Sequence, residues 1–309
     1  MSSTNIIHVF SPGTVSNVSC GFDVLGFCLD SIGDDMIVRA TTQKGIRITK
    51  IEGFDLPYET HENVAGVSAQ ALIADFQPDC GFEIEIYKKI KPGSGIGSSS
   101  ASAAGSVFAI NELMGRPYTP TQLTHFAMKG EAVASQSEHA DNLAPALFGG
   151  FTLVKSLNPL TILKLPIPSN LYASIIHPQI EIKTAEARAI LPKQIPLQDA
   201  IEQWANVGSL VHALHTDDDQ LLQSALHDAI VEPYRSQLIP HFDDVKRESL
   251  AAGALGMGIS GSGPSMFALS KSEKVAKRVE TAMRNVYHST GIEFATYVSK
   301  INPTGIKIK

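Results

Sequence analysis

One short segment of the 309-residue chain is rich in glycine and serine and could bind a polyphosphate. Backbone N–H groups hold phosphate oxygens when glycine lets the backbone approach closely and a helix points its unpaired N-terminal donors at the anion. Gly93, Gly95 and Gly97 precede a helix-forming run and meet both conditions. We therefore predict an anion-binding loop made of Pro92, Gly93, Ser94, Gly95, Ile96, Gly97, Ser98, Ser99, Ser100, Ala101 and Ser102.

The alternative interpretation of this loop is a flexible connector, because Gly/Ser-rich composition is also typical of linkers. The loop joins an alternating strand pattern directly to a strong helix pattern with no spare residues, and this context favours the anion site. It is not a Walker A loop, since no GK[ST] follows the glycines, and it lacks the acidic residue of a dinucleotide fingerprint. The serine hydroxyls could act as further donors or as neutral ligands of Mg²⁺.

Glu131 is a carboxylate on an otherwise apolar helical stripe, which it shares with Leu123, Ala127 and Ala134. A carboxylate buried in this way needs a positive partner. A Mg²⁺ ion shared with bound phosphates is one candidate, and an ion pair with Lys129 or a distant basic residue is the other. From periodicity alone the ion pair is the better interpretation.

Hydrophobic periodicity predicts the elements that position this loop. The clearest strand is Phe82 to Ile90, where strict alternation places Phe82, Ile84 and Ile86 on one face of a half-buried, antiparallel sheet. A helix should begin within the serine run and stop at Gly115, so that its N-terminus opens onto the loop. A capping box with proline at its first helical position starts a second helix at Thr119. Further strands are expected at 6–9, 36–40, 46–51 and 151–154.

The second half of the chain repeats the mixture of helices and strands. Strands are expected at 171–176, 257–260, 265–269 and 292–298, and helices at 201–214, 221–231, 242–254 and from Glu273. The proline-spaced segment 159–168 is where we place a change of domain, which divides the chain into residues 1–158 and 159–309. This order predicts an α+β fold in both domains, and a chain of this length favours a crevice between two lobes.

Composition excludes several classes of partner. Hydrophobic residues make up 43% and charged residues 18% of the chain, and the net charge is −6 without any basic stripe, so nucleic acid is not expected to bind. Neither a signal-peptide pattern nor an apolar run long enough to span a membrane is present. Three cysteines without CxxC spacing fit a reducing compartment, so a cytoplasmic protein is expected.

Several motifs together resemble the GHMP kinases, the superfamily of galactokinase, homoserine kinase, mevalonate kinase and phosphomevalonate kinase. The loop from Pro92 to Ser102 resembles the second motif of that superfamily, and Gly258 to Ser265 resembles the third. The segments from Ser11 to Gly26 and from His139 to Gly150 resemble the N-terminal motif and a later motif in their homoserine kinase form. The signatures span most of the chain in the expected order.

The resemblance implies a fold and a set of ligands. The N-terminal domain would have a ribosomal-S5-domain-2-like fold and the C-terminal domain a ferredoxin-like fold, with the active site between them, and the chain would form a homodimer. ATP and Mg²⁺ would act together with L-homoserine, whose side-chain hydroxyl would be phosphorylated to O-phospho-L-homoserine in threonine biosynthesis.

The resemblance also assigns roles by position. Ser99, or its neighbour Ser98, and Glu131 would be ligands of Mg²⁺, while Asn63 and Val64 would lie near the adenine. For the amino acid, Arg188 and Arg235 would clamp the carboxylate with their planar guanidinium groups. The polar contacts to the amino acid would come from Asn17, His139 and Asn142, and Asp23 would lie close to the attacking hydroxyl.

The acceptor of the hydroxyl proton stays open between several groups. Other members of the superfamily use an aspartate in the segment that aligns with Ala140–Asn142, but this segment is one residue longer here than in mevalonate kinases. Asp141 could therefore turn away from the substrate and Asn142 take its place. Because a loose transition state tolerates late proton transfer, a mechanism without a dedicated base is slightly favoured over Asp141 or Asp23 as base. The competing functions are another GHMP kinase and a non-catalytic metabolite sensor.

Overall fold

The computed structural model describes residues 5–135 and 139–309. Its first sheet has seven strands in the order β11-β1-β2-β4-β3, with β5 and β6 joined to it through β2. The strands are β1 (Ile6–Ser16), β2 (Leu25–Thr41), β3 (Gly45–Glu52), β4 (Gly81–Tyr87), β5 (Phe151–Leu157), β6 (Leu160–Leu165) and β11 (Lys307–Ile308). Their pairs are antiparallel as predicted, except that β3 pairs with β4 in parallel.

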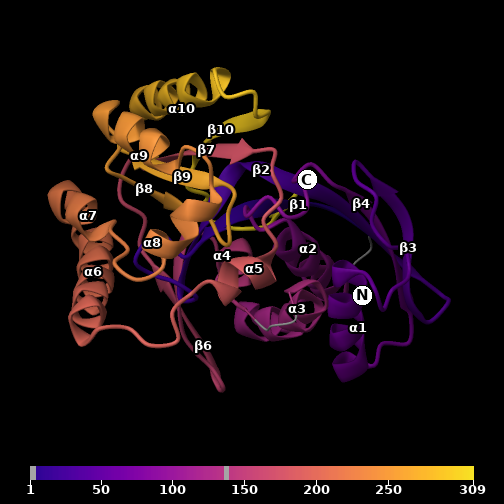
Figure 1. Ribbon diagram of the computed structural model, residues 1–309. Coiled ribbons are helices and arrows are strands. Elements are labelled where there is room, and N and C mark those ends of the chain that lie inside the picture. The colour runs from indigo at the N-terminus through magenta and orange to yellow at the C-terminus, as the bar shows by residue number, and fades with distance from the viewer. Residues whose placement is uncertain (1–4, 136–138) are drawn as a thin grey trace.

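Four helices lie inside the curve of this sheet (Figure 1). They are α1 (Val64–Phe76), α2 (Ser98–Leu113), α3 (Pro120–Ser135) and α4 (Leu143–Phe148). The predicted apolar face of β4 packs under them, since Phe82, Ile84 and Ile86 are buried in one core cluster with Val107 and Ile110 of α2. The sheet and α2 therefore hold the predicted anion loop between two rigid elements.

The expected helix signals were correct for α2 and α3. Gly115, with φ +82°, follows the end of α2. At the start of α3, the Gln122 side chain accepts a hydrogen bond from the Thr119 amide, and the Gln122 amide donates to the Thr119 hydroxyl at 3.4 Å. This reciprocal pair is the predicted capping box.

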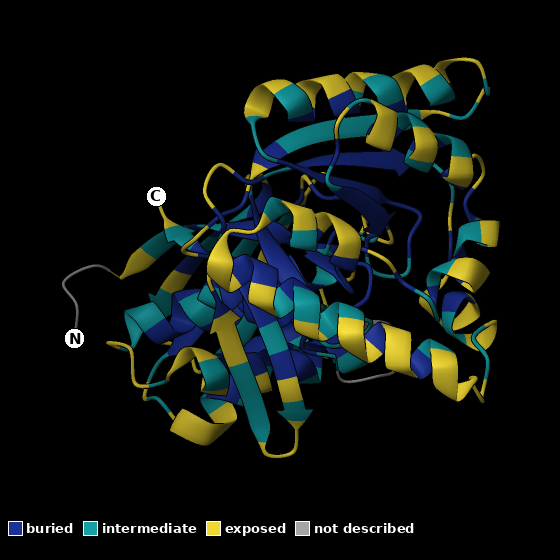
Figure 2. Cartoon of the chain, turned by 90° about the vertical axis from the view of Figure 1, so that its left-hand side faces the viewer, coloured by how far each residue is buried: buried dark blue, intermediate teal, exposed yellow. Residues whose placement is uncertain are grey.

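The second sheet has four antiparallel strands in the order β10-β7-β9-β8. They are β7 (Tyr172–Pro178), β8 (Gly256–Ile259), β9 (Met266–Ser270) and β10 (Phe294–Lys300). Two helices, α9 (Phe242–Ala251) and α10 (Glu273–His288), cover one face. Figure 2 shows the buried strands beneath α10, whose outer face is exposed. The α+β prediction is therefore confirmed in both halves of the chain.

Four further helices lie between β7 and α9 in the chain. They are α5 (Thr184–Ala189), α6 (Leu197–Thr216), α7 (Asp219–Ala225) and α8 (Glu232–Arg235). The helix predicted over 221–231 ends early, because the Asp228 carboxylate accepts the amides of Ile230, Val231 and Glu232 and turns the chain into α8. Within the described residues, no helix is both long and apolar enough to cross a membrane.

The two sheets divide the chain later than the predicted boundary between residues 158 and 159. The break between residues 158 and 159 lies in the turn between β5 and β6, and β6 pairs with β5 in the first sheet. The second sheet starts only at β7, so by sheet membership the change falls in the segment 166–171. The last strand, β11, returns to pair with β1, so the end of the chain also belongs to the first sheet.

Candidate active site

The glycine-rich loop packs tightly between the two halves of the chain. Gly95 has φ +83°, and a Cβ placed on it would lie 2.6 Å from the carbonyl oxygen of Ser260 and 2.7 Å from that of Gly263. Gly97, with φ +68°, caps α2 without a side-chain hydrogen bond. The first amides of α2 are therefore available to an anion, as predicted for a phosphate loop.

The two serines considered as metal ligands differ in their partners. The Ser98 hydroxyl donates to the backbone oxygen of Ile90 at 2.9 Å. Ser99 and Ser100 hydrogen-bond to the carboxylate of Glu131, which is buried at 7% exposure. Burial raises the pKa of Glu131 to about 7, against the opposing effect of the two serine hydrogen bonds. Of the two candidates, Ser99 is the one that meets Glu131.

These residues fit a Mg²⁺ site by the chemistry of their donors. The ion prefers hard oxygen ligands and usually takes one or two from the protein and the rest from phosphates and water. Glu131 and Ser99 line the same cleft as the phosphate loop and offer a carboxylate and a hydroxyl. In the described part of the chain, no group of three or more His, Cys, Asp or Glu residues is placed to hold a metal by itself.

Lys88 is a functional candidate that the sequence prediction missed. Its buried ammonium forms an ion pair with Asp34 and donates at 2.8 Å to the carbonyl oxygen of Ser98, the first residue of α2. The Asp34 carboxylate also accepts hydrogen bonds from the backbone amides of Lys89 and Ile90. Lys88 thus places a positive charge behind the phosphate loop and holds the start of α2 in position.

The residues predicted near adenine line the cleft. Val64 lines it beside Leu56, Pro57 and Val133, which form an apolar surface. Asn63 accepts a hydrogen bond from the Ala65 amide as the N-cap of α1 and donates to the Pro57 oxygen at 2.8 Å. Its side chain therefore holds the apolar wall in place, and Leu56, Pro57 and Val133 extend the predicted set.

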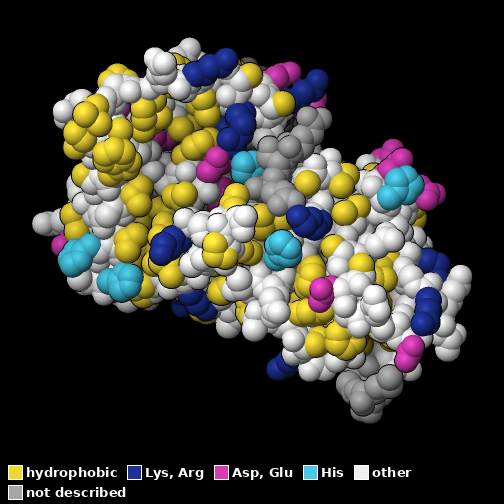
Figure 3. All heavy atoms as spheres, turned by 90° about the horizontal axis from the view of Figure 1, so that it is seen from below, with side chains coloured by type: hydrophobic (Ala, Val, Ile, Leu, Met, Phe, Trp, Pro, Cys, Tyr) yellow, Lys and Arg dark blue, Asp and Glu magenta, His cyan; other side chains and the backbone are white. Residues whose placement is uncertain are grey.

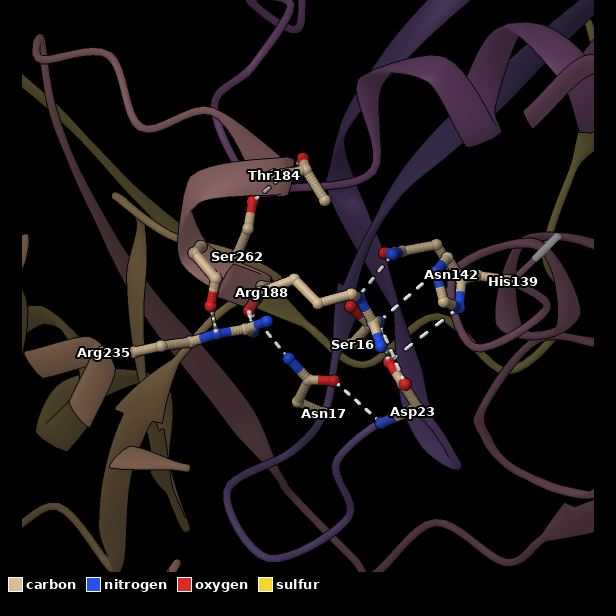
Figure 4. Close-up of polar contacts among 11 residues, drawn as sticks. Ser16, Asn17, Asp23, His139, Asn142, Thr184, Arg188, Arg235 and Ser262 are labelled. Atoms are coloured by element: carbon tan, nitrogen blue, oxygen red, sulfur yellow. Dashed lines mark hydrogen bonds and ion pairs between the residues drawn. The ribbon is translucent and has the colours of Figure 1, made fainter. Parts of the chain in front are cut away.

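Asp23, Arg188 and His139, which all line the cleft, lie close together (Figure 4). The Arg188 Nη2 atom donates to both carboxylate oxygens of Asp23, at 2.9 and 3.0 Å, and lies 3.3 Å from Nε2 of His139. The Asn17 side chain accepts a hydrogen bond from the Asp23 amide and donates one to the Gly261 carbonyl oxygen at 2.7 Å. The structure brings together residues from the loop after β1, from α5 and from the third motif.

Arg235 lies beside this cluster with its side chain buried. Its Nε donates to the oxygen of Ala187 in α5, and its Nη1 donates to the oxygen of Gly261 at 3.0 Å. Burial and the neighbouring Arg188 lower the pKa of Arg235 to about 10, so it keeps its charge near neutral pH. Two guanidinium groups therefore line the same cleft.

Asp141 and Asn142 both line the cleft. The Asn142 side chain accepts a hydrogen bond from the Thr14 hydroxyl at 2.8 Å and donates one to the Ser16 hydroxyl at 2.9 Å. Two residues of β1 therefore hold this side chain in place. Asp141 is 3% exposed, and burial, together with the charge of Asp23, raises its pKa to about 6.

These groups all line one cleft of about 410 Å³. Nearly every predicted site residue is among them, except Ser94, Ile96, Ser100 and Ala101, which support the loop from behind it. The cleft also contains Ser16, Thr184, Gly261 and Ser262, to which the prediction gave no individual role, although Ser16, Gly261 and Ser262 lie in motifs that it recognised. Phosphate donors, a carboxylate and two guanidinium groups in one cleft define a site for transferring a phosphoryl group to a small anionic acceptor.

Family models place the chain in a known class of enzymes. The model described as the GHMP kinases N terminal domain matches residues 63–150, and the model described as GHMP kinases C terminal matches residues 200–289. The chain belongs to the GHMP kinases and is an ATP-dependent small-molecule kinase. The resemblance drawn from the motifs is confirmed, as is the two-domain architecture.

Full-length relatives place the chain within that class, in the homoserine kinase family. The chain is 41% identical to a homoserine kinase of Chlorobium phaeobacteroides (strain BS1) and 42% identical to one of Chlorobaculum tepidum, each over 97% of this chain and over 98% and 97% of theirs. A crystal structure of homoserine kinase from Cytophaga hutchinsonii superposes with a TM-score of 0.96 at 49% identity, covering 100% of this chain and 99% of that one. The L. major mevalonate kinase structure, at 17% identity and a TM-score of 0.72, shares the fold.

Proposed function

We propose that the chain transfers the γ-phosphoryl group of ATP to the side-chain hydroxyl of L-homoserine, forming O-phospho-L-homoserine for threonine biosynthesis. The observation that carries the proposal is the pair of guanidinium groups, Arg188 and Arg235, which line the same cleft as the phosphate loop and lie together over Phe22. Homoserine has a carboxylate to meet these cations and a hydroxyl that can reach back towards the phosphate loop. The full-length relatives named homoserine kinase support the same substrate.

ATP binds along the cleft with its adenine against Val64 and the apolar wall. Its phosphates lie on the glycine-rich loop, where the amides at the start of α2 and the positive end of the helix receive them. Lys88 adds a buried positive charge behind this loop, where it also holds the first turn of α2. In this proposal the γ-phosphate lies between the loop and the residues that bind the acceptor.

The amino acid binds where Asp23 and Arg188 are paired in the free protein. The carboxylate of homoserine is held by Arg188 and Arg235, since a planar guanidinium forms two parallel hydrogen bonds to a carboxylate. Asp23, His139, Asn17 and Asn142 are placed to meet the ammonium and the hydroxyl. Binding of the substrate carboxylate offers Arg188 a second anionic partner, which leaves part of the Asp23 carboxylate available to the ammonium group.

Catalysis rests on positioning and charge neutralisation, with in-line attack of the hydroxyl on the γ-phosphorus. Asn142 is fixed by two hydroxyls of β1 and cannot accept the proton, and Asp23 is engaged with Arg188. Proton transfer late in the reaction, to the phosphate itself, needs no dedicated base. Asp141 then contributes its charge and its contact with Ser16 to the shape of the site.

Mg²⁺ is held by Glu131 and Ser99 in this proposal. When bound, the ion neutralises negative charge on the phosphates. Glu131 offers a buried carboxylate as one ligand of such a cation, and Ser99, which is already in contact with it, offers a hydroxyl. Ser98, whose hydroxyl bonds to the backbone of Ile90, is not part of this ligand set.

A homodimer in the cytoplasm completes the proposal. Leu197, Ile201 and Trp204 form an apolar stripe on α6 with exposures of 69%, 48% and 65%, and their spacing places them on one helix face. Figure 3 shows hydrophobic side chains gathered on the side of the molecule that carries α6. A two-fold axis would bury two copies of this stripe against each other. Trp204→Glu should then shift the mass in sedimentation from dimer to monomer, and an unchanged mass would place the interface elsewhere.

A coupled assay of ADP release tests the substrate. The purified protein, with ATP and Mg²⁺, is offered homoserine, mevalonate and galactose separately. We expect release of ADP that depends on homoserine and a background rate with the other two alcohols. Equal rates with and without homoserine would overturn the proposal.

A further inference from the structure

Phe22 lies at the point where the two arginines meet. The Cζ atom of Arg235 is 4.9 Å from the centroid of the Phe22 ring, and the Cζ atom of Arg188 is 5.4 Å from it. The two arginines come from α8 and α5, whereas Phe22 belongs to the loop between β1 and β2. One aromatic ring from the first half of the chain therefore contacts both cations from the second half.

Two guanidinium groups that must bind one carboxylate repel each other before it arrives. Each of them lies within the range of about 6 Å over which an aromatic face attracts a cation. The face of the ring is negative because of the ring quadrupole, so it offsets part of the repulsion. Asp23 neutralises Arg188 in the free protein, but no carboxylate bonds to Arg235 among the described residues. The ring is thus the group that both cations share.

The backbone on both sides of Phe22 is constrained. A Cβ placed on Gly21 would collide with the side chain of Leu25, so the chain passes closely over β2 at this point. On the other side, Asp23 has φ +60°, and its amide donates to Asn17 at 3.0 Å. Phe22 is fixed between these two constrained residues, as a residue that positions others must be.

We propose that Phe22 is a positioning residue, whose ring face holds Arg188 and Arg235 in the arrangement that receives the carboxylate of the substrate. The inference rests on the proposed function, because it assigns the carboxylate subsite of the same cleft. It gives Phe22 no contact with the phosphates and no part in proton transfer. Its consequence is selectivity for acceptors that carry a carboxylate.

The test compares homoserine with 3-aminopropan-1-ol, which has the same amine and hydroxyl but lacks the carboxylate. In Phe22→Leu the apolar volume remains but the ring face is lost. We expect the KM for homoserine to rise about tenfold with kcat changed less than twofold, and kcat/KM for the amino alcohol to stay within twofold. Phe22→Tyr, which keeps the ring, should retain the KM of the unsubstituted protein. Equal losses for both acceptors in Phe22→Leu would show a packing role and overturn the inference.

A second measurement avoids any dependence on the folding of Phe22→Leu. Replacing Phe22 with mono-, di- and trifluorinated phenylalanine weakens the negative face of the ring stepwise while the shape hardly changes. The KM for homoserine should rise with each fluorine, while the KM for ATP stays constant. If the KM for homoserine did not change with fluorination, the inference would be overturned and the proposed function would stand. If the unsubstituted protein neither bound nor phosphorylated homoserine, both would be overturned.

Discussion

Replacing Glu131 with glutamine should stabilise the metal-free protein at alkaline pH. The pKa of the buried carboxyl is about 7, against an ordinary value of 4.5. Below about pH 4.5 the group is neutral in both the folded and the unfolded protein. As pH rises from there to about 7, the free energy of unfolding falls, because ionisation in the folded state would bury a charge. The difference between 4.5 and about 7 corresponds to about 3 kcal/mol. Glutamine keeps a hydrogen-bond acceptor for Ser99 and carries no charge.

The assay is urea unfolding in EDTA at about pH 5 and about pH 8. We expect the free energy of unfolding of Glu131→Gln to exceed that of the unsubstituted protein by up to about 3 kcal/mol at the higher pH, and by well under half of that at the lower pH. Glu248→Gln, on an exposed side chain of α9, is the control and should show no such difference. Adding Mg²⁺ and ATP should stabilise the unsubstituted protein more than the variant. A difference between Glu131→Gln and the unsubstituted protein that is the same at both pH values would refute the reasoning.

Three further predictions concern the phosphate loop and the proton. Gly95→Ala and Gly115→Ala introduce the same backbone strain, at φ +83° and +82°, but only Gly95→Ala places a Cβ against backbone oxygens. Only Gly95→Ala should therefore raise the KM for ATP, by more than about tenfold. If Gly115→Ala raised it equally, strain alone would explain the effect. Lys88→Met should lower the free energy of unfolding by about 3–5 kcal/mol in urea because it leaves the Asp34 carboxylate buried without its cation, and Asp34→Asn in the same chain should recover part of the loss. No recovery in the double variant would argue against this cause. Asp141→Asn should keep kcat within about tenfold across a pH–rate profile, whereas near-total loss of kcat with homoserine binding intact would establish Asp141 as the general base.

Local features of the site could be predicted because their signals are short-range. The glycine loop with the start of α2 and the capping box of α3 are each signals that span only a few residues, so composition and spacing were enough to predict the loop and the two helices that follow it. Helix α1 was missed because its buried face is formed mainly by small residues, among them Ala65, Gly66 and Ser68. Such residues leave only a weak periodic signal, although they allow close packing against α2 and α3.

Contacts between distant segments could not be derived from periodicity. Lys88 stands at the end of an alternating strand, where a lysine is usually exposed, and only the pairing of β2 with β4 brings Asp34 to it. Asp23 and Arg188 are separated by 165 residues, and only the resemblance to the GHMP kinases suggested that they share a site. The buried position of Glu131 was visible in its helical stripe, but its contact with Ser99 depends on how α3 packs against α2.

The most direct test of the account is a crystal structure of the protein with homoserine, Mg²⁺ and a non-hydrolysable ATP analogue. We predict the phosphates on the amides at the start of α2, the homoserine carboxylate between Arg188 and Arg235, and the hydroxyl in line with the γ-phosphorus. Homoserine bound outside this cleft, or with its carboxylate turned away from both arginines, would contradict the account.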